Sequence, residues 1–352
     1  MNITFLIGNG FDLNLDVKTD YRSFLDYYCS CSSEIEEGKG ADPDIVAFKK
    51  LISDDVWLWS DLEYTLGQKT VEAPLNTVEG LLKCKRDIDR HLRDFLMKQQ
   101  DSITLGKTTE FSRTMIRSTD EISTFFPQQM KNTLNGIYAK HISEDRIFHF
   151  VSFNYTNIFD RCYASMPDRL SGHSHAGSAY EHRKGKLIHL HGSIHQSMLV
   201  GVDNKQQIAN KVLAEDSRVQ RYMIKPRMNA DSQLLRDQTV KDIINSSQIV
   251  VVFGMAIGKT DSSWWKTIAN NMLKNDSILI LVNYQKGLDP SFTYSMVDAR
   301  EKLVDKFLAV CDLNETEKET LRERTHAYFN TKMFKLPHKI EGNENDTSHV
   351  VA

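Results

Sequence analysis

The sequence predicts an α/β fold in which a parallel sheet carries helices on both faces. Short, almost continuous apolar runs are typical of strands buried on both sides, and the chain has three: Ile3–Ile7, Ile147–Phe153 and Gln248–Phe253. Lys186–His191 and Ser277–Tyr284 are two further candidate strands. Where strands alternate with helices, a layered fold with right-handed crossovers is expected.

Helical patterns follow several of these strands. Apolar residues recur at helical spacing in four stretches: Thr19–Tyr28, Thr156–Ala164, Asp261–Leu273 and Asp298–Val310. Between two of the candidate strands, Leu170–Lys186 is rich in Gly, Ser and His. That composition predicts a loop or a hairpin.

The segment 54–141 differs from its surroundings because its apolar residues recur only at helical spacing. Asn76 with Glu79 predicts a capping-box start for one helix, and Pro127 predicts the first turn of a later one. The polar end of the chain predicts a frayed terminus. The expected organisation is a discontinuous α/β domain (1–53 and 142–337), an all-helical insertion (54–141) and a flexible tail (338–352).

Composition excludes several classes of protein. The 352 residues are 40% apolar and 26% charged, as in globular proteins with a sizeable core. A net charge of −3 disfavours nucleic acid as the main partner. The five cysteines are scattered and include no Cys-x-x-Cys pair, which disfavours a disulfide framework and a thiolate zinc site. With no signal-peptide pattern and no long apolar run, we expect a cytoplasmic protein without membrane contact.

Glycine or short polar residues stand at the ends of four candidate strands. These ends read IGNGFD, SFNYTN, HLHGSIH and FGMAIGKTD. Ligands of open parallel sheets bind at the carboxyl ends of the strands. We therefore expect the four segments to share one binding site.

The segment GNGFD, residues 8–12, has two interpretations. Gly8 and Gly10 lack Cβ atoms where a backbone would approach a pyrophosphate, so Gly8, Asn9, Gly10, Phe11 and Asp12 are candidate nucleotide contacts. The third glycine of the usual dinucleotide fingerprint is absent. The alternative is a tight strand exit in which Asp12 bonds the loop backbone.

SFNYTN places Asn154 at a strand end, where an amide can hold a water molecule or a ribose hydroxyl. The neighbouring Tyr155 and Thr156 are candidate cofactor contacts. The alternative is structural: Asn154 closes the strand, and Thr156 caps the following helix.

FGMAIGKTD is one residue too short between its glycines for a phosphate-binding P-loop. The next strand also ends in Asn283 rather than in a Mg²⁺-binding aspartate, so we discount an NTPase. Asp261 is most simply a helix N-cap, although Gly254 and Asp261 remain candidate ligand contacts. Trp264 and Trp265 are interpreted as packing residues.

HLHGSIH carries three histidines, for which metal binding, core packing and catalysis are all open. His189 and His191 share one face of a strand, but no carboxylate or cysteine lies close by in the sequence, so no metal is expected. We interpret His189 as a satisfied core residue and give His195 no role. His191 precedes Gly192 at the lip of the sheet, where an imidazole can act as a base.

Taken together, these segments resemble the AbiH family of bacterial abortive-infection, phage-defence proteins. The signatures of that family are an opening IGNGFD, a mid-chain FNYT, a HG strand end and an FG…D segment. Here they occur in the same order, as Ile7–Asp12, Phe153–Thr156, His191–Gly192 and Phe253–Asp261.

The family is in turn similar to sirtuins, which implies a Rossmann-like, sirtuin-like domain that binds NAD. The sirtuin cofactor loop corresponds to Gly8–Gly10 followed by Val17–Arg22, one residue longer here. The Asn-x-Asp motif corresponds to Asn154-Tyr155-Thr156, in which threonine replaces the acid. The catalytic histidine corresponds to His191. The paired cysteines of the sirtuin zinc module are absent.

Sirtuin-like defence proteins without the zinc module tend to hydrolyse NAD. The resemblance therefore implies an NAD⁺ glycohydrolase that yields ADP-ribose, with His191 and Asn154 catalytic. A non-catalytic NAD or ADP-ribose sensor that engages a partner through the helical insertion is the alternative. A metal-dependent hydrolase using Asp12, His189 and His191 ranks last. A phage-derived trigger and a homo-oligomer are the expected partners.

Overall fold

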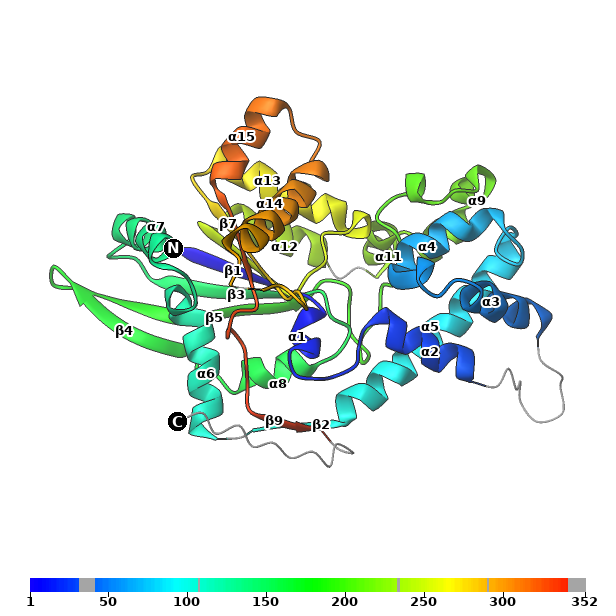
Figure 1. The fold of residues 1–352 in the computed structure, drawn as a ribbon, viewed down its shortest axis with the longest axis horizontal. Helices are drawn as coiled ribbons and strands as arrows, with labels where there is room; N and C mark the ends of the chain where they lie inside the picture. The colour runs from blue at the N-terminus through cyan, green and yellow to red at the C-terminus, as the bar shows by residue number, and fades with distance from the viewer. Residues whose placement is uncertain (32–41, 107, 233–234, 290, 341–352) are drawn as a thin grey trace.

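A seven-stranded sheet forms the centre of the protein, in the order β4-β5-β3-β1-β6-β7-β8 (Figure 1). The computed structural model describes residues 1–31, 42–106, 108–232, 235–289 and 291–340. The strands of the sheet are β1 (Asn2–Ile7), β3 (Arg146–Ser152), β4 (Arg169–His175), β5 (Ser178–His189), β6 (Ile249–Phe253), β7 (Ile278–Asn283) and β8 (Thr325–Phe329). Neighbouring strands run parallel except for β4 against β5. The predicted α/β fold is confirmed.

Helices are distributed along the whole described chain. Their bounds are α1 (Gly10–Leu13), α2 (Tyr21–Ser30), α3 (Pro43–Ser53), α4 (Leu62–Gln68), α5 (Val78–Asp101), α6 (Thr109–Asp120), α7 (Gln128–Lys140), α8 (Ile158–Ala164), α9 (Lys211–Glu215), α10 (Ser217–Met223), α11 (Lys225–Asp231), α12 (Arg236–Asn245), α13 (Ser262–Lys274), α14 (Thr293–Ala309) and α15 (Glu315–Glu323). The four helices predicted after strands are confirmed as α2, α8, α13 and α14, with ends that differ by a few residues.

Both faces of the sheet are covered, as its apolar strands require. On one face, side chains of α6, α7 and α8 pack against alternate residues of β1, such as Phe5. On the other face, α12, α13, α14 and α15 pack against residues such as Leu6. Trp264 and Trp265 are buried in this second core, which confirms them as packing residues.

A third core lies beside the sheet and consists of helices (Figure 1). We call it the helical lobe; it comprises α2 to α5, α9 and α10 with the segment 194–208. The predicted insertion 54–141 is shared between two cores, because α4 and α5 belong to the lobe whereas α6 and α7 cover the sheet. The lobe also takes helices from outside that insertion.

Some local predictions are wrong. Helix α5 is capped by the Thr77 side chain, which accepts from the amide of Gly80, so the predicted capping box of Asn76 and Glu79 does not form. Pro127 is the N-cap of α7 rather than a residue of its first turn. In the predicted tail, His338–Ile340 forms β9, which pairs with β2 (Ile103–Leu105); residues 341–352 lie outside the described part.

The predicted hairpin at 170–186 is confirmed as the antiparallel pair β4–β5. Strand β5 ends at His189, so His191 lies just beyond the strand rather than within it. In the described residues, no helix is both long and apolar enough to cross a membrane.

The register brings the predicted strand ends into one row. Ile7 of β1 pairs with Ser152 of β3 and with Phe253 of β6, and Ser152 pairs with His189 of β5. Because these strands are parallel, the segment after each one leaves the sheet at the same edge. The four glycine- or amide-bearing segments therefore meet there.

Candidate functional site

A cleft of about 1060 Å³ opens at this carboxyl edge, between the sheet and the helical lobe. Helix α5 of the lobe contributes Leu92 and Leu96 to its lining. From the strand ends, the cleft is lined by Gly8, Asn9, Gly10, Asp12, Asn154, Tyr155, Thr156, His191, Gly254 and Asp261. The structure thus gathers all the predicted site residues except Phe11 in one cavity.

Phe11 faces the core instead of the cleft. Its ring is fully buried and packs edge-on against Phe159 and Phe334. Helix α1 begins at Gly10, and its helical turn directs Asp12 to the cleft and the preceding side chain inward. Phe11 therefore anchors the turn rather than contacting a ligand.

The glycines of the first turn allow two loops to touch. A Cβ atom at Gly10 would lie 2.5 Å from the Cα atom of Gly254, and the amide of Gly10 donates to the carbonyl of Gly254 at 2.7 Å. Gly254 itself has a φ of +65°, a conformation that favours glycine. The tight strand exit is therefore present, and the same turn lines the cleft.

Asp12 is fully buried and bonded to side chains from β3's exit loop. Its carboxylate accepts from the hydroxyl of Thr156 at 2.6 Å and from the amide of Asn154 at 3.2 Å. Burial raises the pKa of Asp12 to about 6, although these hydrogen bonds favour the charged form. The Thr156 side chain therefore donates to Asp12 instead of capping α8, whose N-cap is Asn157. The expected bond from the Asp12 side chain to its own loop backbone is absent among the described residues.

Asn154 retains an unsatisfied hydrogen-bond acceptor. Its side chain is 4% exposed, and no group in the described part of the chain donates to its Oδ1 atom. Buried polar atoms are normally bonded to protein, water or ligand. A hydroxyl group in the cleft would supply the missing donor.

His191 is a neutral imidazole in a buried setting. Its Nε2 atom lies 3.3 Å from Oδ1 of Asp261, and its ring packs edge-on against Phe153. Burial and the nearby charge of Lys225 lower the pKa of His191 to about 3. At neutral pH the ring can donate one hydrogen bond and accept another, but it is a weak proton acceptor.

A buried ion network surrounds this histidine. The Lys225 ammonium lies 2.7 Å from Glu63 and 3.1 Å from Asp261, and the hydroxyl of Tyr155 donates to Glu63 at 2.7 Å. Burial disfavours the charge on Lys225, but Asp261 and Glu63 together raise its pKa. For Glu63, burial outweighs the pairing and raises the pKa.

Sequence reasoning missed Glu63 and Lys225. They lie in the first turns of α4 and α11, which are far apart in the chain, and neither belongs to a recognisable motif. Asp261 was predicted as an N-cap, but its side chain makes no capping bond and pairs with Lys225 instead. The helix of Lys225 is mostly polar, so no local signal distinguishes this lysine from an ordinary surface lysine.

His189 is a satisfied core residue, as predicted. Its Nε2 atom lies 2.8 Å from Asp160 and its Nδ1 atom 3.2 Å from the carbonyl oxygen of Asn154. In the described part of the chain, Asp12, His189 and His191 do not form a group with metal-ligand spacing. The geometry therefore does not support a metal-dependent hydrolase at this edge.

Comparison with known proteins identifies the family. A family model described as bacteriophage abortive infection AbiH matches residues 4–284, which include the strand ends that line the cleft. No curated protein matches the chain. Because the matched region spans most of the 352 residues, the chain belongs to the AbiH family, which indicates a role in abortive infection as a defence against bacteriophage.

Proposed function

We propose that the cleft binds NAD⁺ and hydrolyses the bond between nicotinamide and ribose. The observation that carries the proposal is the shared cavity: the glycine turn of residues 8–10, the Asp12 carboxylate and the His191 imidazole all line it. Its volume of about 1060 Å³ is slightly above the usual range for small-molecule sites, roughly 300–1,000 Å³, which suits a ligand as large as a dinucleotide. Abortive infection would follow from depletion of NAD⁺ in the infected cell.

The chemistry needs little acid catalysis. As the bond between the ribose C1′ atom and nicotinamide breaks, nicotinamide leaves as a neutral base with the bonding electrons. Water adds to C1′ and releases a proton, so the products are ADP-ribose, nicotinamide and H⁺. The barrier lies in stabilising a positively charged ribose and in positioning the water molecule.

Asp12 suits both tasks. A carboxylate with a pKa of about 6 is ionised at neutral pH and still able to accept a proton from water. Asn154 would accept a hydrogen bond from that water or from a ribose hydroxyl through its unsatisfied Oδ1 atom. In the motif to which Asn154–Thr156 is similar, an acid occupies the third position; here Asp12, bonded to Thr156, would supply that carboxylate.

His191 takes a different role from the general base that the sequence predicts. With a pKa of about 3 it is a poor general base, so we assign it to holding a ribose hydroxyl as a neutral hydrogen-bonding group. The backbone amides near Gly8 and Gly10 would bind the pyrophosphate. Oligomerisation or a blocking segment would keep the enzyme silent before infection, and a phage-derived trigger would activate it.

The decisive experiment is mass spectrometry of NAD⁺ incubated with the purified protein, with and without phage lysate. Release of nicotinamide with ADP-ribose is the expected result. His191→Ala should lower turnover by about tenfold, the loss expected for one hydrogen bond to the ribose, whereas His195→Ala, an exposed neighbour, should not. Full turnover in His191→Ala would refute its assignment.

A non-catalytic sensor is the second candidate. Both oxygens of Asp12 already accept hydrogen bonds from the protein, and the low pKa of His191 suits recognition better than proton transfer. Calorimetry with NAD⁺ and with ADP-ribose separates the two functions. Binding without nicotinamide release would support the sensor and refute the hydrolase.

A further inference from the structure

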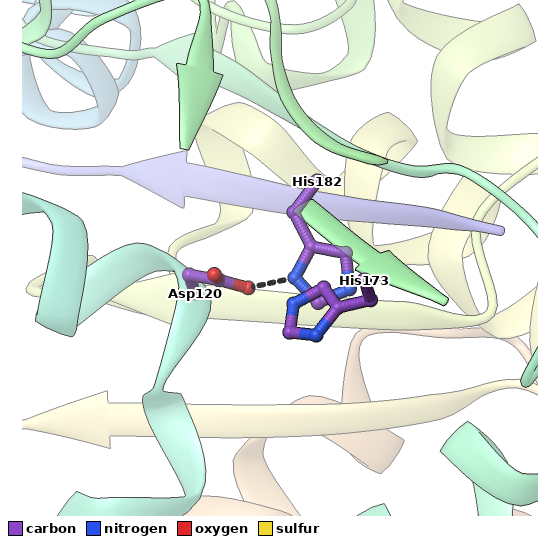
Figure 2. A group of neighbouring side chains, drawn as sticks. All are labelled: Asp120, His173 and His182. Atoms are coloured by element: carbon purple, nitrogen blue, oxygen red, sulfur yellow. Dashed lines mark hydrogen bonds and ion pairs between the residues drawn. The ribbon is translucent and has the colours of Figure 1, made fainter. Parts of the chain in front are cut away.

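A second polar cluster lies at the opposite end of the sheet from the cleft. It consists of Asp120, His173 and His182 (Figure 2). His182 of β5 pairs with Arg146 at the start of β3, whereas the cleft lies beyond Ser152 at the end of that strand. The cluster is therefore remote from the proposed NAD⁺ site, and none of its three residues lines the cleft.

Three separate elements supply the cluster. Asp120 ends α6, His173 lies on β4 and His182 on β5. Each side chain offers a potential ligand atom, and these atoms all lie within 4.8 Å of one another. The antiparallel hairpin thus brings two imidazoles to the carboxylate of a helix that precedes it by about fifty residues in the chain.

Hydrogen bonds already hold the three groups together. The Nδ1 atom of His182 lies 2.6 Å from Oδ1 of Asp120. The hydroxyl of Ser171 donates to Oδ2 of Asp120 at 2.8 Å and lies 2.9 Å from Nε2 of His173. The two imidazole rings lie 4.2 Å apart between their centres. A small inward movement of the exposed His173 would bring the ligand atoms to metal-binding distance.

The buried histidine is only half satisfied. His182 is 5% exposed, and within the described residues its Nε2 atom has no hydrogen-bond partner. The atom of His182 that faces the Asp120 carboxylate is Nδ1, whose lone pair points away from that of Nε2. His182 and Asp120 can therefore bind the same ion only through Nδ1, with the ion in place of the proton that they share.

We propose that Asp120, His173 and His182 bind a divalent transition-metal ion of the Zn²⁺ class. One carboxylate and two imidazoles form a ligand set that zinc accepts in proteins. Metal–ligand distances of about 2.0–2.2 Å place neighbouring ligand atoms roughly 3.4 Å apart, so the cluster must contract slightly. Because His173 is exposed, the remaining coordination position faces solvent. The ion would tie the β4–β5 hairpin to α6.

One nearby cation limits the affinity. The Nη1 atom of Arg146 lies 3.9 Å from Oδ1 of Asp120, and its guanidinium stacks on Tyr138. The positive charge repels a dication at that distance. Neutralising Arg146 should therefore tighten metal binding, which a purely structural hydrogen-bond cluster does not predict.

The test is calorimetric titration of Zn²⁺ into tag-free, chelator-treated, full-length protein. We expect one ion per chain in the wild type, and an affinity loss of about 10–100-fold or more in His173→Ala. His175→Ala is the matched control, because His175 is exposed on the same strand and lies outside the cluster. His173 is itself exposed, so its variant should fold.

Two further measurements decide the assignment. The visible spectrum of bound Co²⁺ should show nitrogen and oxygen ligation in the wild type and in His175→Ala, and should be lost in His173→Ala and Asp120→Asn. Arg146→Gln should bind Zn²⁺ more tightly than the wild type. Equal Zn²⁺ affinity in the wild type and His173→Ala, or no binding by the wild type, would overturn the proposal.

Discussion

Asp12 and Asp261 are carboxylates that line the same cleft, yet their pKa values shift in opposite directions. Asp12 is surrounded by neutral donors, and burial raises its pKa to about 6. Asp261 has the Lys225 ammonium 3.1 Å away, which outweighs burial and lowers its pKa. Neutral hydrogen bonds offset only part of the cost of burying a charge, whereas a counter-ion offsets more.

The comparison separates two tasks within the cleft. The group of Asp12, Asn154 and Thr156 contains a carboxyl, that of Asp12, which gains or loses a proton near neutral pH, as acid–base chemistry requires. The group of Glu63, Lys225 and Asp261 pairs its charges with one another; burial and the charge of Lys225 keep the neighbouring His191 neutral, although Asp261 favours its protonation. Four predictions test this division, from the largest expected effect to the smallest.

Asp12→Asn should abolish most NAD⁺ turnover. An amide cannot accept the proton from water, so we expect a loss of about 10²–10⁴-fold, the usual contribution of a general base. Wild-type turnover should also fall below pH 6, as the carboxyl becomes protonated. Nicotinamide release measured from pH 5 to 8 tests both effects, with the exposed Asp26→Asn as control. A pH-independent rate would show that Asp12 is not the base.

Lys225→Met should strongly destabilise the fold. It leaves Glu63 and Asp261 buried without their cation, and breaking such a pair typically costs about 3–5 kcal/mol. Urea unfolding at pH 7.5 measures the loss. Lys259→Met is the control, because Lys259 is exposed in the neighbouring loop, and it should change stability by less than about 0.5 kcal/mol. Equal effects of the two variants would contradict the ion network.

Asp12→Asn should stabilise the fold at pH 8 even though it inactivates the site. Because the folded-state pKa of about 6 exceeds the ordinary value of 3.8, the folded state binds protons more tightly. Stability therefore falls as pH rises from 3.8 to 6, by about 3 kcal/mol at most. The variant avoids this cost, and we expect a gain of about 1–3 kcal/mol at pH 8 that disappears near pH 4. A destabilised variant at pH 8 would show that the hydrogen bonds to the Asp12 carboxylate stabilise the fold by more than the burial of its charge costs.

His191 should give the opposite pH dependence. Its folded-state pKa of about 3 lies below the ordinary value of 6.5, so its contribution to stability is complete above pH 6.5 and is lost as pH falls towards 3. At pH 5.5 the loss is about 1–2 kcal/mol. Unfolding of wild type and His191→Gln at pH 7.5 and 5.5 tests this: the variant should lose less stability on acidification. An equal loss would mean that another group carries the effect.

Much of the fold was predictable because its signal is local. Buried parallel strands need continuous apolar runs, and all five predicted runs lie in strands of the sheet. The strand-end motifs could be placed together because parallel strands end at one edge. Helix boundaries were harder: Asn76 with Glu79 satisfies the capping pattern, but Thr77 caps α5 in the structure. Asn76 and Thr77 are neighbouring polar residues that can both cap a helix, and the local sequence does not decide which of them caps α5.

The polar partners could not be predicted in the same way. Thr156 and Asp261 both stand where a capping residue is expected, but a buried Asp12 and a buried Lys225 bind them more strongly. Those partners come from other strands and helices. The Asp120, His173 and His182 cluster was missed for the same reason, since its members lie on one helix and two strands.

The sequence by itself determined the parallel sheet, the edge at which its glycine and amide segments meet, and the satisfied core role of His189. The spacing of apolar residues and the length of apolar runs are properties of neighbouring residues, so they can be recognised in the sequence. Only the tertiary structure decided which charges face each other across the cleft, that Phe11 points inward, and that His191 stays neutral. Burial and charge pairing depend on distances between segments remote in sequence, and these distances exist only after the chain has folded.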